Sequence, residues 1–155
     1  MDNEKQFAVI NLGELRWPPA LQLPSVRFRL FVAADVDEVS TQAISDFAFS
    51  ALRRGMVYFC SWGRGCERFH DIVDEAVLED DMGERKFVGP RAGDVVMTTW
   101  HDRDSLEEAL DFFARFAVPT DGLSPDSDFR LVICVNNPGW ATAASRFLQT
   151  AKFFI

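Results

Sequence analysis

The sequence predicts an α/β fold, a three-layer sandwich around a mostly parallel sheet of four to five strands. Two observations predict it. Short apolar runs rich in Val and Phe recur along the chain, and each is followed by a segment with the apolar spacing of an amphipathic helix. Repeated strand–helix alternation is typical of a parallel sheet with helices on both faces. We therefore expect a flavodoxin-like or a Rossmann-like sandwich, with a strand order that one sequence does not define.

The four apolar runs lie at residues 28–34, 56–60, 94–99 and 129–135. They mostly lack alternation of polar and apolar residues. Continuous apolar runs of this length are typical of strands buried on both faces of a sheet. We expect all four runs to be buried strands.

The four helical stripes lie at residues 44–51, 69–77, 106–117 and 144–151. Gly55 and Gly83 stand where the first two helices would end, because glycine is favoured just after a helix C-terminus. Ser105 and Glu108 have the spacing of a capping box at the start of the third helix, and Pro119 follows its last turn.

The chain of 155 residues is long enough for one domain with its own core. We expect a single α/β domain over residues 28–155. Residues 1–27 precede it as an extended arm, with Trp17-Pro18-Pro19 in it and a possible extra strand at 7–10. The arm could wrap the sheet or contact a partner.

The formal net charge of −8 makes nucleic acid an improbable partner, because that binding depends on Lys and Arg neutralising phosphates. No run of about 18 apolar residues is present, so we expect no membrane contact. The polar N-terminus is unlike a secretory signal, and three cysteines are too few for a disulfide scaffold. These features favour a cytoplasmic location.

The carboxyl ends of the strands are where open α/β sheets bind ligands. Three of the four tryptophans fall in the loops expected there. The candidate ligand-binding residues are Trp62, Arg64, Trp100, His101, Asn136, Asn137 and Trp140. The alternative is structural: such loops need Gly, Asn and Asp for turns and caps, and tryptophan can cover the end of a sheet.

The stretch Gly63-Arg64-Gly65 could hold an anion on backbone N–H groups. A dinucleotide-binding fingerprint needs a third glycine where this chain has Arg68, and no Gly-Lys-Ser/Thr triplet exists. We therefore expect a tight turn and no cofactor.

Cys66, His101 and Asp102 are the weak catalytic candidates, as a Cys–His–Asp nucleophilic set. Cys66 lies near a predicted helix N-terminus and Arg64, which would favour its thiolate. No oxyanion donor can be identified, so no catalytic residue is assigned. Cys60, Cys66 and His70 lack the usual zinc spacing, and we expect no metal.

Residues 67–81 contain seven carboxylates and one arginine, which gives this helix most of the chain's excess negative charge. Asp71, Asp74 and Glu75 share one helical face. The face could simply be solvated. Alternatively, it could bind a basic protein, since charge complementarity steers association.

Two functions follow. The first is a small acidic non-enzymatic interaction module of the immunity, accessory or adaptor type, similar in size and charge to such bacterial proteins. The alternative is a small-molecule or nucleotide-binding domain, with Cys66-dependent enzymatic activity as one form of it, using the tryptophans at the carboxyl end of the sheet. The apolar residues 151–155 could form a homodimer contact.

Overall fold

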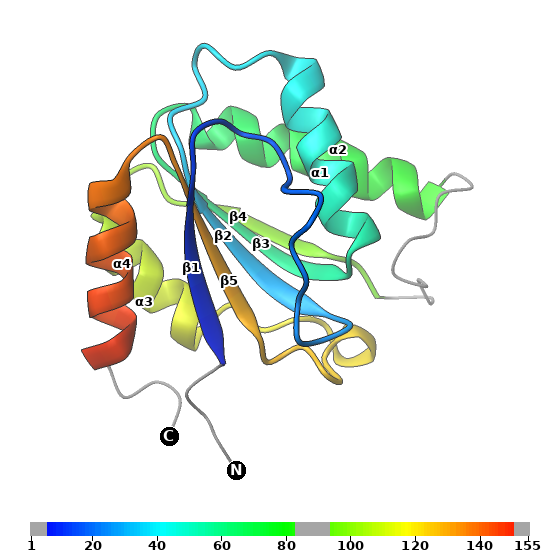
Figure 1. The fold of residues 1–155 in the computed structure, drawn as a ribbon. Coiled ribbons are helices and arrows are strands. Elements are labelled where there is room, and N and C mark those ends of the chain that lie inside the picture. The colour runs from blue at the N-terminus through cyan, green and yellow to red at the C-terminus, as the bar shows by residue number, and fades with distance from the viewer. Residues whose placement is uncertain (1–5, 83–93, 151–155) are drawn as a thin grey trace.

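A sheet of five parallel strands forms the centre of the computed structural model, which describes residues 6–82 and 94–150 (Figure 1). The strands are β1 (Phe7–Leu12), β2 (Phe28–Ala33), β3 (Met56–Trp62), β4 (Met97–Trp100) and β5 (Arg130–Val135). Their order across the sheet is β1-β5-β2-β3-β4. The predicted α/β sandwich with a parallel sheet is confirmed.

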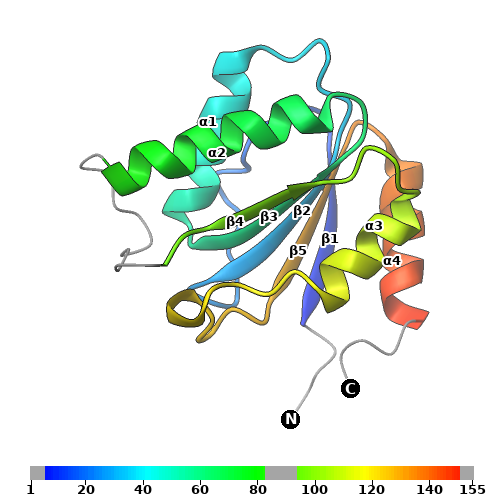
Figure 2. The same cartoon turned by 180° about the vertical axis from the view of Figure 1, so that it is seen from behind.

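Helices cover both faces of this sheet, as Figures 1 and 2 show. The first pair, α1 (Thr41–Arg53) and α2 (Cys66–Met82), packs on one face over a core that includes Phe28, Phe47 and Phe69. The second pair, α3 (Leu106–Arg115) and α4 (Pro138–Thr150), packs on the other over a core that includes Phe31 and Phe113. A short 3-10 turn, η1 (Asp121–Leu123), lies between α3 and β5.

Strand order resembles a Rossmann sheet over four strands. Counted from β2, strands β2 to β5 lie in the order 3-2-1-4, and β1 takes the next position beside β5. The flavodoxin order 2-1-3-4-5 is not the one observed. The direction in which successive strands are added to the sheet therefore changes between β2 and β5, whose following helices, α1 and α4, lie on opposite faces.

The arm before β2 covers the α1 face of the sheet in the place where a crossover helix would otherwise lie (Figure 1). Leu15 and Trp17 are buried there. The Trp17 ring lies 5.6 Å from Phe47 and 5.9 Å from Phe28, measured between ring centroids. The arm is thus part of the hydrophobic core.

Helix ends follow the residues expected to set them. Gly55 adopts φ +104° after α1, and a Cβ there would lie 2.0 Å from the Val26 carbonyl oxygen, so only glycine fits. The capping box of Ser105 and Glu108 at the start of α3 is confirmed. Gly83, expected to end α2, and the apolar residues 151–155 lie outside the described residues.

One strand prediction is wrong. β2, β3 and β5 are largely buried, but β4 is a short edge strand whose Met97 and Trp100 are exposed. The run 94–99 resembles a buried strand because α2 covers one of its faces. Sequence alone does not show that β4 lies at the edge of the sheet that the described residues form.

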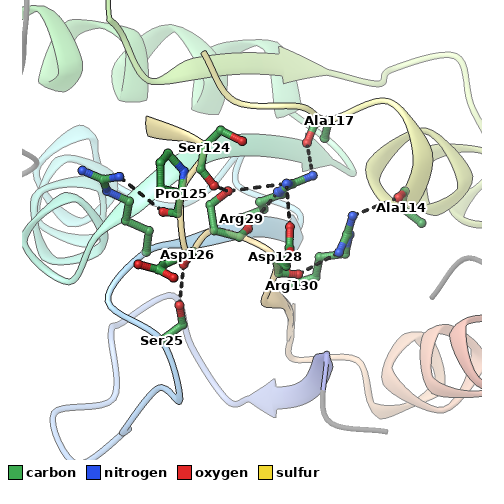
Figure 3. Close-up of polar contacts among 11 residues, drawn as sticks. Ser25, Arg29, Ala114, Ala117, Ser124, Pro125, Asp126, Asp128 and Arg130 are labelled. Carbon is green, nitrogen blue, oxygen red and sulfur yellow. Dashed lines mark hydrogen bonds and ion pairs between the residues drawn. The ribbon is translucent and has the colours of Figure 1, made fainter. Parts of the chain in front are cut away.

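A cluster of arginines holds the amino end of the sheet (Figure 3). Arg29 and Arg130 are register partners on β2 and β5. The buried Arg29 guanidinium donates to the carbonyl oxygens of Ser127 at 2.9 Å and Ala117 at 3.0 Å. Arg130 donates to the Ala114 carbonyl oxygen at the end of α3, at 3.3 Å. Burial lowers the pKa of both side chains, to about 10 for Arg130, where the charge of Arg29 adds to the effect.

Candidate functional site

The turn Gly63-Arg64-Gly65 is packed tightly against the loop after β2. Gly63 adopts φ +118°, and a Cβ there would lie 2.2 Å from the Ala34 carbonyl oxygen. The Arg64 backbone N–H donates to Asp35 Oδ1 at 2.9 Å, and the Arg64 carbonyl accepts from Val36 N–H at 2.9 Å. Since these backbone groups are engaged within the chain, the stretch is a closely packed turn, while the Arg64 side chain is exposed.

Trp62 and Trp140 pack against each other at the carboxyl end of the sheet. Their ring centroids are 5.1 Å apart in an edge-to-face arrangement. The Trp62 indole N–H donates to the Asp104 carbonyl oxygen at 2.9 Å. The two rings cover the end of the sheet on the α3–α4 side, and the Trp62 indole N–H already has its hydrogen-bond acceptor in Asp104.

The His101 imidazole contacts side chains of its own loop. Its Nδ1 lies 3.0 Å from Asp104 Oδ2, and its Nε2 lies 3.0 Å from Thr99 Oγ1. The ring packs on Phe112 with a centroid distance of 4.8 Å. Both ring nitrogens are therefore engaged, and His101 joins β4 to the start of α3.

Cys66 is near His101, but not near its imidazole. The His101 backbone N–H, which donates to the Ser61 carbonyl oxygen at 3.0 Å, lies close enough to the thiol to lower its pKa against the larger effect of burial. Cys66 is only 2% exposed, and its burial raises the pKa of the thiol, to which the negative charge of Asp102 adds. The sequence-based expectation of a favoured thiolate at a helix N-terminus is thus reversed by desolvation. The three residues are neighbours without forming a nucleophile–base pair.

The two asparagines after β5 set the backbone for α4. Asn136 adopts φ +54°, which asparagine tolerates, and its N–H donates to the Leu12 carbonyl oxygen at 2.6 Å. Asn137 Oδ1 accepts from the Trp140 backbone N–H at 3.1 Å, as an N-cap does, and Pro138 occupies the first helical position. Both residues have structural roles here.

Trp100 lies apart from Trp62 and Trp140, on the other face of the sheet. It lies at the end of β4 on the α2 side, where its ring is 4.5 Å from that of His70. His70 Nδ1 in turn lies 2.9 Å from Asp71 Oδ1. Trp100 is 40% exposed and belongs to the surface of α2 and β4. The predicted group of three tryptophans is therefore divided between two faces.

Of the three residues considered for metal binding, Cys60, Cys66 and His70, the first and the last are also separated. Cys60 is fully buried in the core beneath α3 and α4, where it accepts a hydrogen bond from Thr99 Oγ1 at 3.3 Å, while His70 lies on α2. Over residues 6–82 and 94–150, no group of three or more His, Cys, Asp or Glu side chains is placed to hold a metal ion.

The exposed surface of α2 and β4 combines carboxylates with apolar side chains. We call it the α2–β4 surface; it consists of Asp71, Asp74, Glu75, Leu78, Val95 and Trp100. Leu78 is 56% exposed and Val95 37% exposed, although both are large apolar residues. A hollow of about 320 Å³ lies here, lined by Asp74, Glu75, Val77, Leu78, Val95 and Val96.

Helix α2 and strand β4 run side by side along this surface. His70 contacts Trp100, Thr98 Oγ1 donates to Asp74 Oδ1 at 2.5 Å, and Leu78 and Val95 line the same hollow. Positions one helical turn apart on α2, at 70, 74 and 78, thus meet positions 100 and 98 of β4 and position 95 just before it. The periodicity of α2 predicted its acidic face, but no local signal identified the exposed apolar residues of β4 beside it.

Two further hollows lie beside the arm. One of about 720 Å³ is lined by Leu12, Gly13, Glu14, Arg16, Trp17, Pro18 and Pro19, and one of about 450 Å³ lies between the arm and α1. Both are shallow and open. The residues predicted to bind a ligand at the carboxyl end do not line either of these two hollows.

The fold and surface define a small acidic α/β domain with an exposed edge strand. Residues 8–150 match a family described as a domain of unknown function, DUF7684, and the chain belongs to that family. No curated protein and no solved structure matches the chain. None of the helices in the described residues is long and apolar enough to cross a bilayer.

Proposed function

We propose that this protein is a small acidic, non-enzymatic interaction module that binds a partner protein through the α2–β4 surface. The observation that carries the proposal is the combination of Asp71, Asp74 and Glu75 with exposed Leu78 and Trp100 on one surface. Exposed apolar residues ringed by polar ones are typical of protein-binding surfaces. The partner would present a basic contact surface, because opposite charges steer encounter and determine specificity.

Most of the described carboxylates of α2 are exposed, whereas Asp80 is buried. The exposed ones are Glu67, Asp71, Asp74, Glu75 and Glu79. The only arginine or lysine among positions 67–81, Arg68, donates to the carbonyl oxygens of Val36 and Val39 at 2.9 and 3.0 Å. Arg68 therefore lies against the loop after β2. The carboxylates of Asp71 and Asp74 are 62% and 52% exposed. A basic partner would meet them without first displacing a lysine or arginine that the described residues place there.

The ligand-binding alternative has less support. It required the tryptophans and His101 to converge on a cleft at the carboxyl end of the sheet. Trp62, Trp140 and His101 instead have partners within the chain, and Trp100 lies on another face. We therefore assign no ligand to this end.

The test is differential capture by matched baits. The wild-type protein is immobilised beside the variant D71K/D74K/E75K and beside a control, E38K/E107K/D121K, which makes the same charge change at exposed positions elsewhere. We expect a basic protein to be retained by the wild type and the control, to be lost from the first variant, and to elute as salt is raised. Equal retention by all three baits would refute the proposal.

A further inference from the structure

One hydrogen-bonding side of strand β4 pairs with no other strand among residues 6–82 and 94–150. The other side pairs with β3, from Tyr58–Met97 to Ser61–Trp100. The His101 backbone N–H donates to the Ser61 carbonyl oxygen, so His101 faces β3. Because backbone groups alternate along a strand, those of Thr99 and Met97 face β3 as well, and those of Thr98 and Trp100 face outward. Figure 2 shows β4 at the open edge of the sheet.

The surroundings of this edge are chemically specific. On the α2 side it is bordered by the hollow that contains Leu78 and Val95, and by the carboxylates of Asp74 and Glu75. An extended chain lying along β4 would place alternate side chains toward α2. Apolar side chains fit the hollow, and basic side chains reach the carboxylates beside it.

We propose that the partner contributes an extended segment that adds to the sheet as a strand beside β4, and that every second residue of this segment, on the face toward α2, is basic or apolar in turn. This inference rests on the proposed function and names the form of the contact. Strand addition uses backbone groups for affinity and alternate side-chain sites for specificity. The outward-facing backbone groups of Thr98 and Trp100 would supply affinity, and the α2–β4 surface would supply the sites for alternate side chains.

A second copy of this chain is a poor occupant of the edge. Pairing two β4 strands would bring two copies of the acidic face of α2 together, each from a chain of net charge −8. Like charges facing each other across an interface oppose association. A helical partner segment would leave the outward groups of β4 unpaired.

The experiment uses the intact protein and three synthetic peptides. The first, the Lys/Val peptide, repeats Lys-Thr-Val-Thr and so presents Lys and Val in turn on one face. The second has the same sequence with alternate amides N-methylated. The third, the Glu/Val peptide, has Glu in place of Lys. Binding is measured by Trp100 fluorescence and by NMR exchange of the Thr98 and Trp100 amides. Two variants accompany it: Thr98→Pro removes the outward N–H, and Thr98→Ala is its matched control, since both lose the hydroxyl that bonds Asp74.

We expect the Lys/Val peptide to bind and to slow exchange of both amides. N-methylation should weaken binding by on the order of tenfold relative to the unmethylated peptide, and Thr98→Pro should weaken it by a similar factor relative to Thr98→Ala, because each removes backbone hydrogen bonds. The Glu/Val peptide should not bind.

Three results would overturn the inference. Equal binding of the N-methylated peptide would mean a charge contact without strand addition; the proposed function would then stand. Slow exchange of both amides in the free protein, or a dimer that protects them, would mean that the edge already has another occupant. Absence of binding by the Lys/Val peptide would exclude this peptide chemistry, and the capture experiment would separately decide the proposed function.

Discussion

The Thr98 hydroxyl donates to Asp74 Oδ1 at 2.5 Å, and this bond joins the exposed edge strand to the acidic face of α2. It orients the carboxylate of Asp74 beside the hollow that contains Leu78. The edge of the sheet and the acidic helix are therefore one surface. The predictions below test that surface and the structure that supports it.

Removing this bond should cost little stability. Thr98→Val keeps the β-branched shape and deletes the hydroxyl. Since Asp74 is half exposed, water replaces the lost donor, and the free energy of unfolding should fall by less than about 1 kcal/mol. Urea unfolding measures it. A loss of several kcal/mol would mean that the contact is part of the core.

The arginine cluster should matter far more. Arg29→Met leaves buried carbonyl oxygens of Ala117 and Ser127 without their donor, so we expect a loss of about 2–4 kcal/mol in the free energy of unfolding.

Arg27→Met is the matched control for that variant. Its guanidinium makes two longer contacts of 3.3 Å, with the Gly122 and Pro125 carbonyl oxygens. We expect it to lose less than about 1 kcal/mol. Equal losses for the two variants, measured by urea unfolding, would contradict the distinction between them.

The thiols should be unreactive in the folded protein. Burial raises the pKa of Cys60 and Cys134 to about 12 and also raises that of Cys66. Near pH 8, Ellman's reagent should therefore react only slowly with the native protein. In denaturant it should react readily with all three thiols. One fast-reacting thiol, abolished by Cys66→Ser, would restore the nucleophile hypothesis.

Stability should fall as pH rises above about 9. Cys60 and Cys134 titrate at about 12 when folded against a reference value of 9.0. Between these values the unfolded chain has lost protons that the folded chain retains, so the free energy of unfolding decreases with pH. Arg130, with a folded pKa of about 10, acts in the opposite sense above that pH.

The informative window for that effect is therefore about pH 9 to 10. Urea unfolding across it should show a negative slope in the wild type and a shallower one in Cys134→Ala. A free energy of unfolding that stays flat or rises would contradict the assignment of buried, protonated thiols.

The parts of the fold that the sequence predicted are those set by local pattern. The apolar stripe and the capping box of Ser105 and Glu108 predicted α3, and Gly55 marked the end of α1 because its backbone conformation excludes a side chain. Strand order depends on long-range pairing, so the exposed position of β4 was not predicted.

The candidate sites likewise divide into features that local pattern predicted and features that depend on the folded arrangement. The acidic face of α2 follows from helical periodicity and is present as expected. The arrangement of His101 and Cys66 depends on where each side chain points after folding, which spacing does not define. The arginine cluster did have a signal in the sequence. The triplet Phe-Arg-Leu occurs at 28–30, where it begins β2, and again at 129–131, where its arginine is the first residue of β5.

The most direct test of the central claim is hydrogen exchange of this protein with and without the partner retained in the capture experiment. The proposed function predicts slowed exchange in residues 71–78 and 95–100. No change there, with protection instead at residues 61–66, 101–104 and 136–140, would contradict it and place the binding site at the carboxyl end of the sheet.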